Sequence, residues 1–105
     1  MSAMGQVPKL EEVIAILRAH EDFYRAKGVT RMAVFGSVAR GDAGPDSDVD
    51  LVIDYDRESR FSLLTLCGVQ NDTADWLGRK VDVLTWDALK PRISKRVAEE
   101  AADVF

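Results

Sequence analysis

The sequence has little of what marks several large classes of protein. Its single cysteine, Cys67, excludes an intramolecular disulfide framework and a cysteine-based zinc cluster, and suits a reducing cytoplasm. No apolar run approaches the roughly twenty residues needed to span a bilayer, and the N-terminus lacks the hydrophobic core of a signal peptide. We therefore expect a cytoplasmic protein without a membrane anchor, in which Cys67 is a buried packing residue.

Positive charge and histidine are also scarce. Lys and Arg number 14 against 18 Asp and Glu, which gives a formal net charge of -4. Because affinity for nucleic acid comes mainly from Lys and Arg, direct nucleic-acid binding is not expected. The only histidine, His20, lies away from every polar motif, which favours a packing role. The absence of a Gly-x-x-x-x-Gly-Lys motif argues against a P-loop ATPase.

What is present is the composition of one ordinary globular domain. The chain has 105 residues, of which 47% are hydrophobic and 30% are charged. A chain of this length buries roughly two thirds of the surface that its unfolded form exposes. That is enough for one core and too little for an added substrate-binding domain. We expect a single domain over 1–105, and a large substrate must bring its own binding surface.

Hydrophobic spacing predicts a helix and then a strand in the first third of the chain. The helix begins with Pro8 in its first turn and ends at Gly28. The run 29–35 is rich in β-formers and predicts a buried strand. Ser37 is then expected to cap a short helix that continues through Arg40.

The rest of the chain follows a similar pattern. A helix is predicted from Ser59 or Ser62 to Gly78, and a strand over 80–84. A final helix is predicted with Pro91 in its first turn and with an inner face formed by Ile93, Val97 and Ala101. The basic residues of this helix are expected to form a solvated face or to contact an acidic partner; they are Lys90, Arg92, Lys95 and Arg96.

The segment 48–54 carries the most informative pattern. It follows a loop predicted at 41–47 from its glycines, proline and aspartates. Since side chains alternate along a strand, one face carries Val49, Leu51 and Ile53, and the other carries Asp48, Asp50, Val52 and Asp54.

Asp48 and Asp50 then point the same way, with Cα atoms roughly 6.6 Å apart. They can share a pair of metal ions. Asp82, in the third strand, faces away from its valine neighbours and can complete a three-carboxylate site. Hard oxygen ligands of this kind suit Mg²⁺ and leave coordination positions for water and substrate phosphates.

The turn before this acidic strand is a candidate phosphate-binding site. Gly36 lets the backbone approach a phosphate closely, and Ser37 adds a hydroxyl donor at the start of the short helix. Arg40 lies three residues further on. Its guanidinium either returns to the same pocket or pairs with Asp42 or Asp46, and the sequence leaves both roles open.

Two other interpretations of the acidic stretch are less favoured. An isolated Asp-x-Asp is usually a solvated turn, but the spacing from Gly36 and the apolar strand that follows favour a site. An EF-hand calcium loop fails at Leu51, where a glycine is needed, and at Arg57, where a bidentate glutamate is needed.

The two motifs together resemble a known family. Phe-Gly-Ser-Val-Ala-Arg-Gly at 35–41, Ser-Asp-Val-Asp-Leu at 47–51 and Asp82 on a later strand are similar to the signature of the DNA polymerase β nucleotidyltransferase superfamily. More narrowly, they resemble the minimal nucleotidyltransferases, which are often encoded beside a HEPN-domain protein. The similarity covers most of the chain.

The resemblance implies a fold, a site and cofactors. The fold is of the α/β (α+β) class, a small mixed β-sheet flanked by helices. The site binds two Mg²⁺ ions and ATP as nucleotide donor. Asp48, Asp50 and Asp82 are the implied catalytic residues and metal ligands, and the implied nucleotide-binding residues are Gly36, Ser37, Arg40 and Ser47. Members commonly end with a further short strand, whereas Val104 and Phe105 leave only a stub here.

The resemblance also implies a partner. In several such pairs the HEPN protein is a toxic ribonuclease, and the nucleotidyltransferase is the antitoxin that transfers AMP from ATP to a tyrosine of the toxin. Two alternatives stay open: an antitoxin that neutralises the toxin by stoichiometric binding without catalysis, and a small-molecule nucleotidyltransferase similar to the antibiotic-modifying enzymes.

Overall fold

A four-stranded mixed sheet, with strand order β3-β2-β1-β4, forms the centre of the computed structural model, which describes residues 7–105. The predicted fold class is therefore confirmed. β1 runs antiparallel to β2 and to β4, whereas β2 and β3 are parallel. The strands are β1 (Val29–Phe35), β2 (Val49–Tyr55), β3 (Val81–Thr85) and β4 (Ala102–Asp103). The first six residues of the domain predicted over 1–105 lie outside the described residues.

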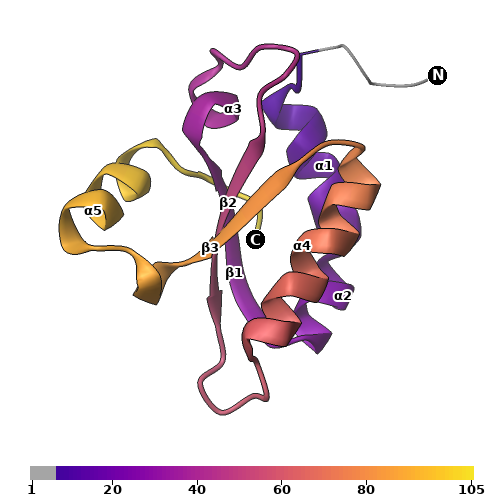
Figure 1. Ribbon diagram of the computed structural model, residues 1–105, viewed down its shortest axis with the longest axis vertical. Helices are drawn as coiled ribbons and strands as arrows, with labels where there is room; N and C mark the ends of the chain where they lie inside the picture. The colour runs from indigo at the N-terminus through magenta and orange to yellow at the C-terminus, as the bar shows by residue number, and fades with distance from the viewer. Residues whose placement is uncertain (1–6) are drawn as a thin grey trace.

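Helices cover both faces of this sheet (Figure 1). One face carries α1 (Leu10–Ala19), α2 (Glu21–Ala26) and α4 (Leu63–Leu77). The other carries α5 (Pro91–Glu100), which follows β3 through the 3-10 turn η1 (Trp86–Ala88). The short α3 (Gly36–Arg40) continues directly from the end of β1. Within residues 7–105, no helix is long and apolar enough to cross a membrane.

The two faces have cores of different size. The larger core lies under α1, α2 and α4 and includes Leu17, Tyr24, Leu51 and Ile53, all fully buried. The smaller core lies under α5. Its buried residues are Ala33, Val52 and Val97, with Trp86 and Leu89 packed against them. The predicted alternation along β2 is confirmed, but Val52 is buried by α5 and is not solvated beside the aspartates.

The predicted first helix is wrong in its continuity. It is interrupted at His20, whose N–H donates to Leu17 O only three residues back and so ends α1. Its imidazole stacks on Trp76, with 3.5 Å between ring centroids, which agrees with a packing role. Pro8 also lies outside the helix, because Lys9 is the N-cap.

Two side-chain predictions, at Ser37 and Cys67, are corrected, and the choice left open between Ser59 and Ser62 is decided. Ser37 does not cap α3, because Phe35 occupies the N-cap position and Ser37 lies inside the first turn. Ser62, not Ser59, precedes α4, and its hydroxyl accepts the Thr65 N–H at 3.3 Å. Cys67 is exposed. The buried positions of α4 recur every four residues at Val69, Thr73 and Leu77, which turns Cys67 to the solvent side.

The last helix and the C-terminus also differ from expectation. Val97 is buried, whereas Ile93 is 47% exposed, because α5 covers the sheet with its second half. A short strand precedes the expected stub: β4 pairs with β1 through Ala33↔Asp103 and Val34↔Ala102. Beyond β4, Met32 and Val104 continue the pairing, with a 2.8 Å bond from the Val104 N–H to Met32 O. The fourth strand therefore forms the second edge of the sheet.

Candidate active site

The motif residues meet at one end of the sheet. Gly36 follows the last residue of β1, Asp50 is the second residue of β2, and Asp82 is the second residue of β3. The strand register places Phe35 opposite Asp50, and Asp50 opposite Asp82. Gly36 and Asp82 are 46 positions apart in the sequence. The sheet places them on either side of Asp50.

Gly36 and Asp50 are in close contact. Gly36 is buried and has a φ of 76°, a left-handed conformation that favours glycine. A Cβ added at Gly36 would overlap the Oδ2 atom of Asp50. Both the backbone conformation and the space therefore require glycine, and the bare Cα lets the β1–α3 turn lie directly against the carboxylate.

The surroundings of Asp50 are electrostatically unfavourable to its charge. Partial burial raises the pKa of the Asp50 carboxyl above its usual value, and the negative charges of Asp82 and Asp48 raise it further. The positive charge of Arg40 acts in the opposite direction. The three aspartates thus form a negative region that a cation would relieve.

Asp48 lies immediately before β2, although the strand was predicted to begin at Asp48. Its Oδ2 is 3.8 Å from the Nζ of Lys80, which precedes β3. Among residues 7–105, no three side chains of the His, Cys, Asp and Glu types are arranged as a ready-made metal cage. Mutual repulsion of the carboxylates and the Asp48–Lys80 pair are consistent with that. The donor set itself, three hard carboxylates at one strand end, suits Mg²⁺.

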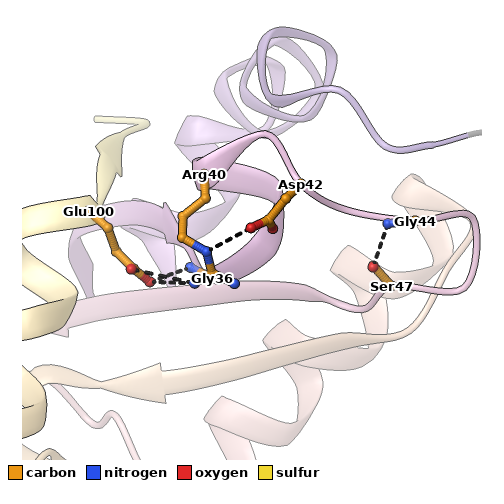
Figure 2. Close-up of polar contacts among 6 residues, drawn as sticks. All are labelled: Gly36, Arg40, Asp42, Gly44, Ser47 and Glu100. Carbon is orange, nitrogen blue, oxygen red and sulfur yellow. Dashed lines mark hydrogen bonds and ion pairs between the residues drawn. The ribbon is translucent and has the colours of Figure 1, made fainter.

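The other predicted nucleotide-binding residues shape the loop beside this region. Arg40 pairs with Asp42 at 3.2 Å, one of the two roles left open for it (Figure 2). The Ser47 hydroxyl accepts the Gly44 N–H at 2.8 Å and closes the loop. The backbone oxygen of Ser37 accepts the N–H groups of Gly41 and Asp42, and Ser37 is partly exposed at the turn.

A recess of about 240 Å³ lies beside Asp48 and is lined by residues that include Ser47, Arg79 and Lys80. Arg79 donates from Nη1 to Ser47 O at 2.9 Å, so the recess joins the two loops that lead into β2 and β3. A larger open recess of about 420 Å³ lies at the opposite end of the sheet, near the start of β1. It contains none of the predicted site residues.

One site residue was not predicted from the sequence. The Gly36 N–H donates to the Oε1 atom of Glu100 at 2.9 Å, and Glu100 also pairs with Arg40 (Figure 2). Glu100 is the last residue of α5, 64 positions away in the chain. No local pattern connects it with the turn, because the contact exists only once α5 has folded over the sheet.

Comparison with known proteins agrees with this arrangement. A family model described as "Nucleotidyltransferase domain" matches residues 12–104. The protein adenylyltransferase MntA of Thermococcus cleftensis is 40% identical to this chain over 96 residues, which cover 90% of this chain and 95% of that protein.

Solved structures agree as well. One that carries the provisional name of a minimal nucleotidyltransferase superposes with a TM-score of 0.79 at 34% identity, over 93% of this chain and 98% of that one. A chain from the complex of the tri-AMPylated HEPN toxin of Shewanella oneidensis with its MNT antitoxin superposes with a TM-score of 0.59. That match has 13% identity over 85% of this chain and 70% of that one, so it supports the fold alone.

Proposed function

This chain belongs to the nucleotidyltransferase domain family, as its motifs indicated, and groups with the protein adenylyltransferases, and we propose that it is the antitoxin of a HEPN toxin–antitoxin pair. In this proposal it transfers AMP from ATP to a tyrosine hydroxyl of the toxin in a Mg²⁺-dependent reaction. The observation that carries it is the meeting of Gly36, Asp50 and Asp82 at one end of the sheet.

Each residue at this end has a specific task in the proposal. Asp48, Asp50 and Asp82 would hold Mg²⁺, which when bound would neutralise phosphate charge and act as a Lewis acid. Gly36 keeps the turn against Asp50 without steric overlap. The Ser37 hydroxyl donates to an oxygen of the triphosphate.

The proposed chemistry is a displacement at the α-phosphorus of ATP. The tyrosine oxygen forms a bond to that phosphorus, the bond to the oxygen that bridges to the β-phosphorus breaks, and pyrophosphate leaves with the electron pair. Asp82, on edge strand β3, accepts the tyrosine proton. Because Asp82 is partly exposed on the outermost strand, an acceptor can approach it from outside the domain.

A protein acceptor is supported by the relatives of this chain. The MntA relative, a protein adenylyltransferase by name, is almost fully covered by this chain. In the Shewanella complex, an AMPylated HEPN toxin is bound to an MNT antitoxin, which supports a HEPN protein as the acceptor here. In our proposal the chain meets such a partner and ATP in the cytoplasm.

Intact-mass spectrometry of a candidate HEPN partner tests the proposal. The partner is incubated with this protein, Mg²⁺ and ATP, beside a control with Asp48→Asn and Asp50→Asn. We expect the partner to gain one or more AMP units only with the unaltered protein. Complex formation without any mass gain would favour the stoichiometric antitoxin. Efficient modification of free aminoglycosides would instead favour the small-molecule enzyme.

A further inference from the structure

Glu100 links the helix on the smaller-core face to the turn at the active site. It ends α5, and one residue separates it from the strand β4 at the edge of the sheet. Its side chain is only 20% exposed, although its neighbour Glu99 on the same helix is exposed to solvent. A carboxylate that is withdrawn from water needs partners, and both partners of Glu100 belong to the Gly36–Arg40 segment.

Both oxygens of the Glu100 carboxylate take part. Oε1 accepts the Gly36 N–H at 2.9 Å. Arg40 Nη1 lies 3.4 Å from Oε1 and 3.5 Å from Oε2, while Arg40 Nε bonds Asp42. Glu100 therefore holds the first and the last residue of α3 at once. Figure 2 shows the three groups converging from α3 and α5.

The contacts of Glu100 act on the backbone at Gly36, the part of the turn that most needs support. Gly36 has a positive φ, and glycine restricts its own backbone less than any other residue. Its N–H is partly buried and has no other protein partner to satisfy it among the described contacts. Loss of Glu100 would leave that donor unpaired and would free the turn that lies against Asp50.

We propose that Glu100 is a positioning residue for the nucleotide: by binding the Gly36 N–H and Arg40 from α5, it fixes the β1–α3 turn in the conformation that receives the triphosphate of ATP. The inference rests on the proposed function and deepens it. It also explains why α5 reaches the site although α5 carries none of the family's motif residues.

Four single variants test separately the length and the charge of the side chain at position 100. Glu100→Gln keeps an oxygen at the right distance for the Gly36 N–H, whereas Glu100→Asp keeps the charge and is one methylene shorter. Glu100→Ala removes both. Glu99→Ala is the matched control, because Glu99 lies on the same helix turn and makes no contact with the turn at Gly36.

Two readouts are measured on each variant. The first is hydrogen exchange of the Gly36 amide, followed by NMR in the protein without ligand. The second is the Kd for Mg²⁺ with the ATP analogue AMPCPP, whose α,β bridge the transfer reaction cannot break. We expect Glu100→Ala and Glu100→Asp to speed Gly36 exchange and to weaken AMPCPP binding about tenfold, the equivalent of one hydrogen bond. Glu100→Gln should lie between these variants and the unaltered protein, and Glu99→Ala should match the latter.

Several outcomes overturn the inference. Equal AMPCPP binding by all four variants would remove Glu100 from nucleotide positioning. Tighter binding by Glu100→Ala would identify Glu100 as a competitor of the phosphate. A Gln variant that behaves like the Ala variant in both readouts would also contradict it. If the unaltered protein failed to bind AMPCPP, the proposed function would fall first, and the two failures are thereby distinguished.

Discussion

The two faces of the central sheet differ in how much apolar core they bury. On the face covered by α1, α2 and α4, apolar side chains such as Leu51 and Ile53 are continuously buried. On the α5 face only a small core is buried, and the sheet end beyond it carries Asp50 and Asp82. Because side chains alternate along each strand, neighbouring residues of β2 serve stability and, in our proposal, chemistry in turn. Substitutions should therefore fall into two classes, those that lower stability and those that lower AMP transfer.

The largest effect is expected on the α5 face, from Asp50→Asn. Removal of one charged group from the site should slow AMP transfer by at least about 10²–10³-fold, while the protein stays folded because Asp50 supports no apolar packing. Transfer is measured as AMP incorporation into the partner, and folding as the thermal unfolding midpoint. Unchanged transfer would remove Asp50 from the site.

The larger core should respond in the opposite way. Leu51→Ala deletes a fully buried side chain and should lower the free energy of unfolding by about 2–5 kcal/mol. Leu84→Ala is the matched control, because Leu84 lies on the other face and is 40% exposed. Urea denaturation of both variants checks this. Equal losses would mean that the two faces do not differ in packing.

A polar pair inside the larger core gives a third test. The hydroxyls of Tyr24 and Thr73 are hydrogen-bonded at 2.6 Å and buried. Thr73→Val should cost about 1–3 kcal/mol of unfolding free energy, because it leaves the Tyr24 hydroxyl unpaired. Adding Tyr24→Phe removes the orphaned hydroxyl and should restore part of that loss. A double variant that is less stable than the single one would contradict this account.

The pH dependence of stability should distinguish the two faces as well. The folded-state pKa of Asp50 is raised above 3.8, so its protonated form favours folding. That contribution is complete below the unfolded pKa and is lost as pH rises through the folded pKa. Asp50→Asn cannot ionise, so it should gain stability relative to the unaltered protein as pH rises above 3.8. Unfolding free energies of both proteins at acidic and neutral pH test this. A stability advantage of Asp50→Asn that shrinks as pH rises would contradict it.

The smallest effect is expected for Lys80→Met. The Lys80 and Asp48 side chains are 73% and 37% exposed, and their charged atoms are 3.8 Å apart. Surface pairs of this kind contribute about 0–1 kcal/mol, so the free energy of unfolding should change by less than that. A loss comparable to that of Leu51→Ala, measured in the same urea experiment, would show that the pair is structural.

The sequence predicted those features that depend on near neighbours. Alternation in β2, the positive-φ glycines Gly41 and Gly78 that end α3 and α4, and the proline at the start of α5 each follow from a few adjacent residues. Gly36, Asp48 and Asp50 were singled out in the same way, because one turn and one strand fix their spacing. Asp82 lies on another strand and was singled out from alternation within that strand and from the family resemblance.

Features that depend on distant contacts were missed. The interruption at His20 coincides with a stack on Trp76, which lies 56 positions away. The exposure of Cys67 depends on which side of α4 meets the sheet. Glu100 reaches Gly36 across 64 positions, and β4 exists because β1 offers it a free edge. Such pairs are fixed by tertiary packing, so no local pattern encodes them.

The most direct test of the central claim follows the two ends of the ATP molecule. A HEPN partner is incubated with this protein and Mg²⁺, with ATP labelled at either the α- or the γ-phosphate, beside the Asp50→Asn variant. Transfer of AMP predicts that the α-label alone reaches the partner, and that the variant transfers neither label. Incorporation of the γ-label, or equal α-labelling by the variant, would contradict a nucleotidyltransferase site at Asp50.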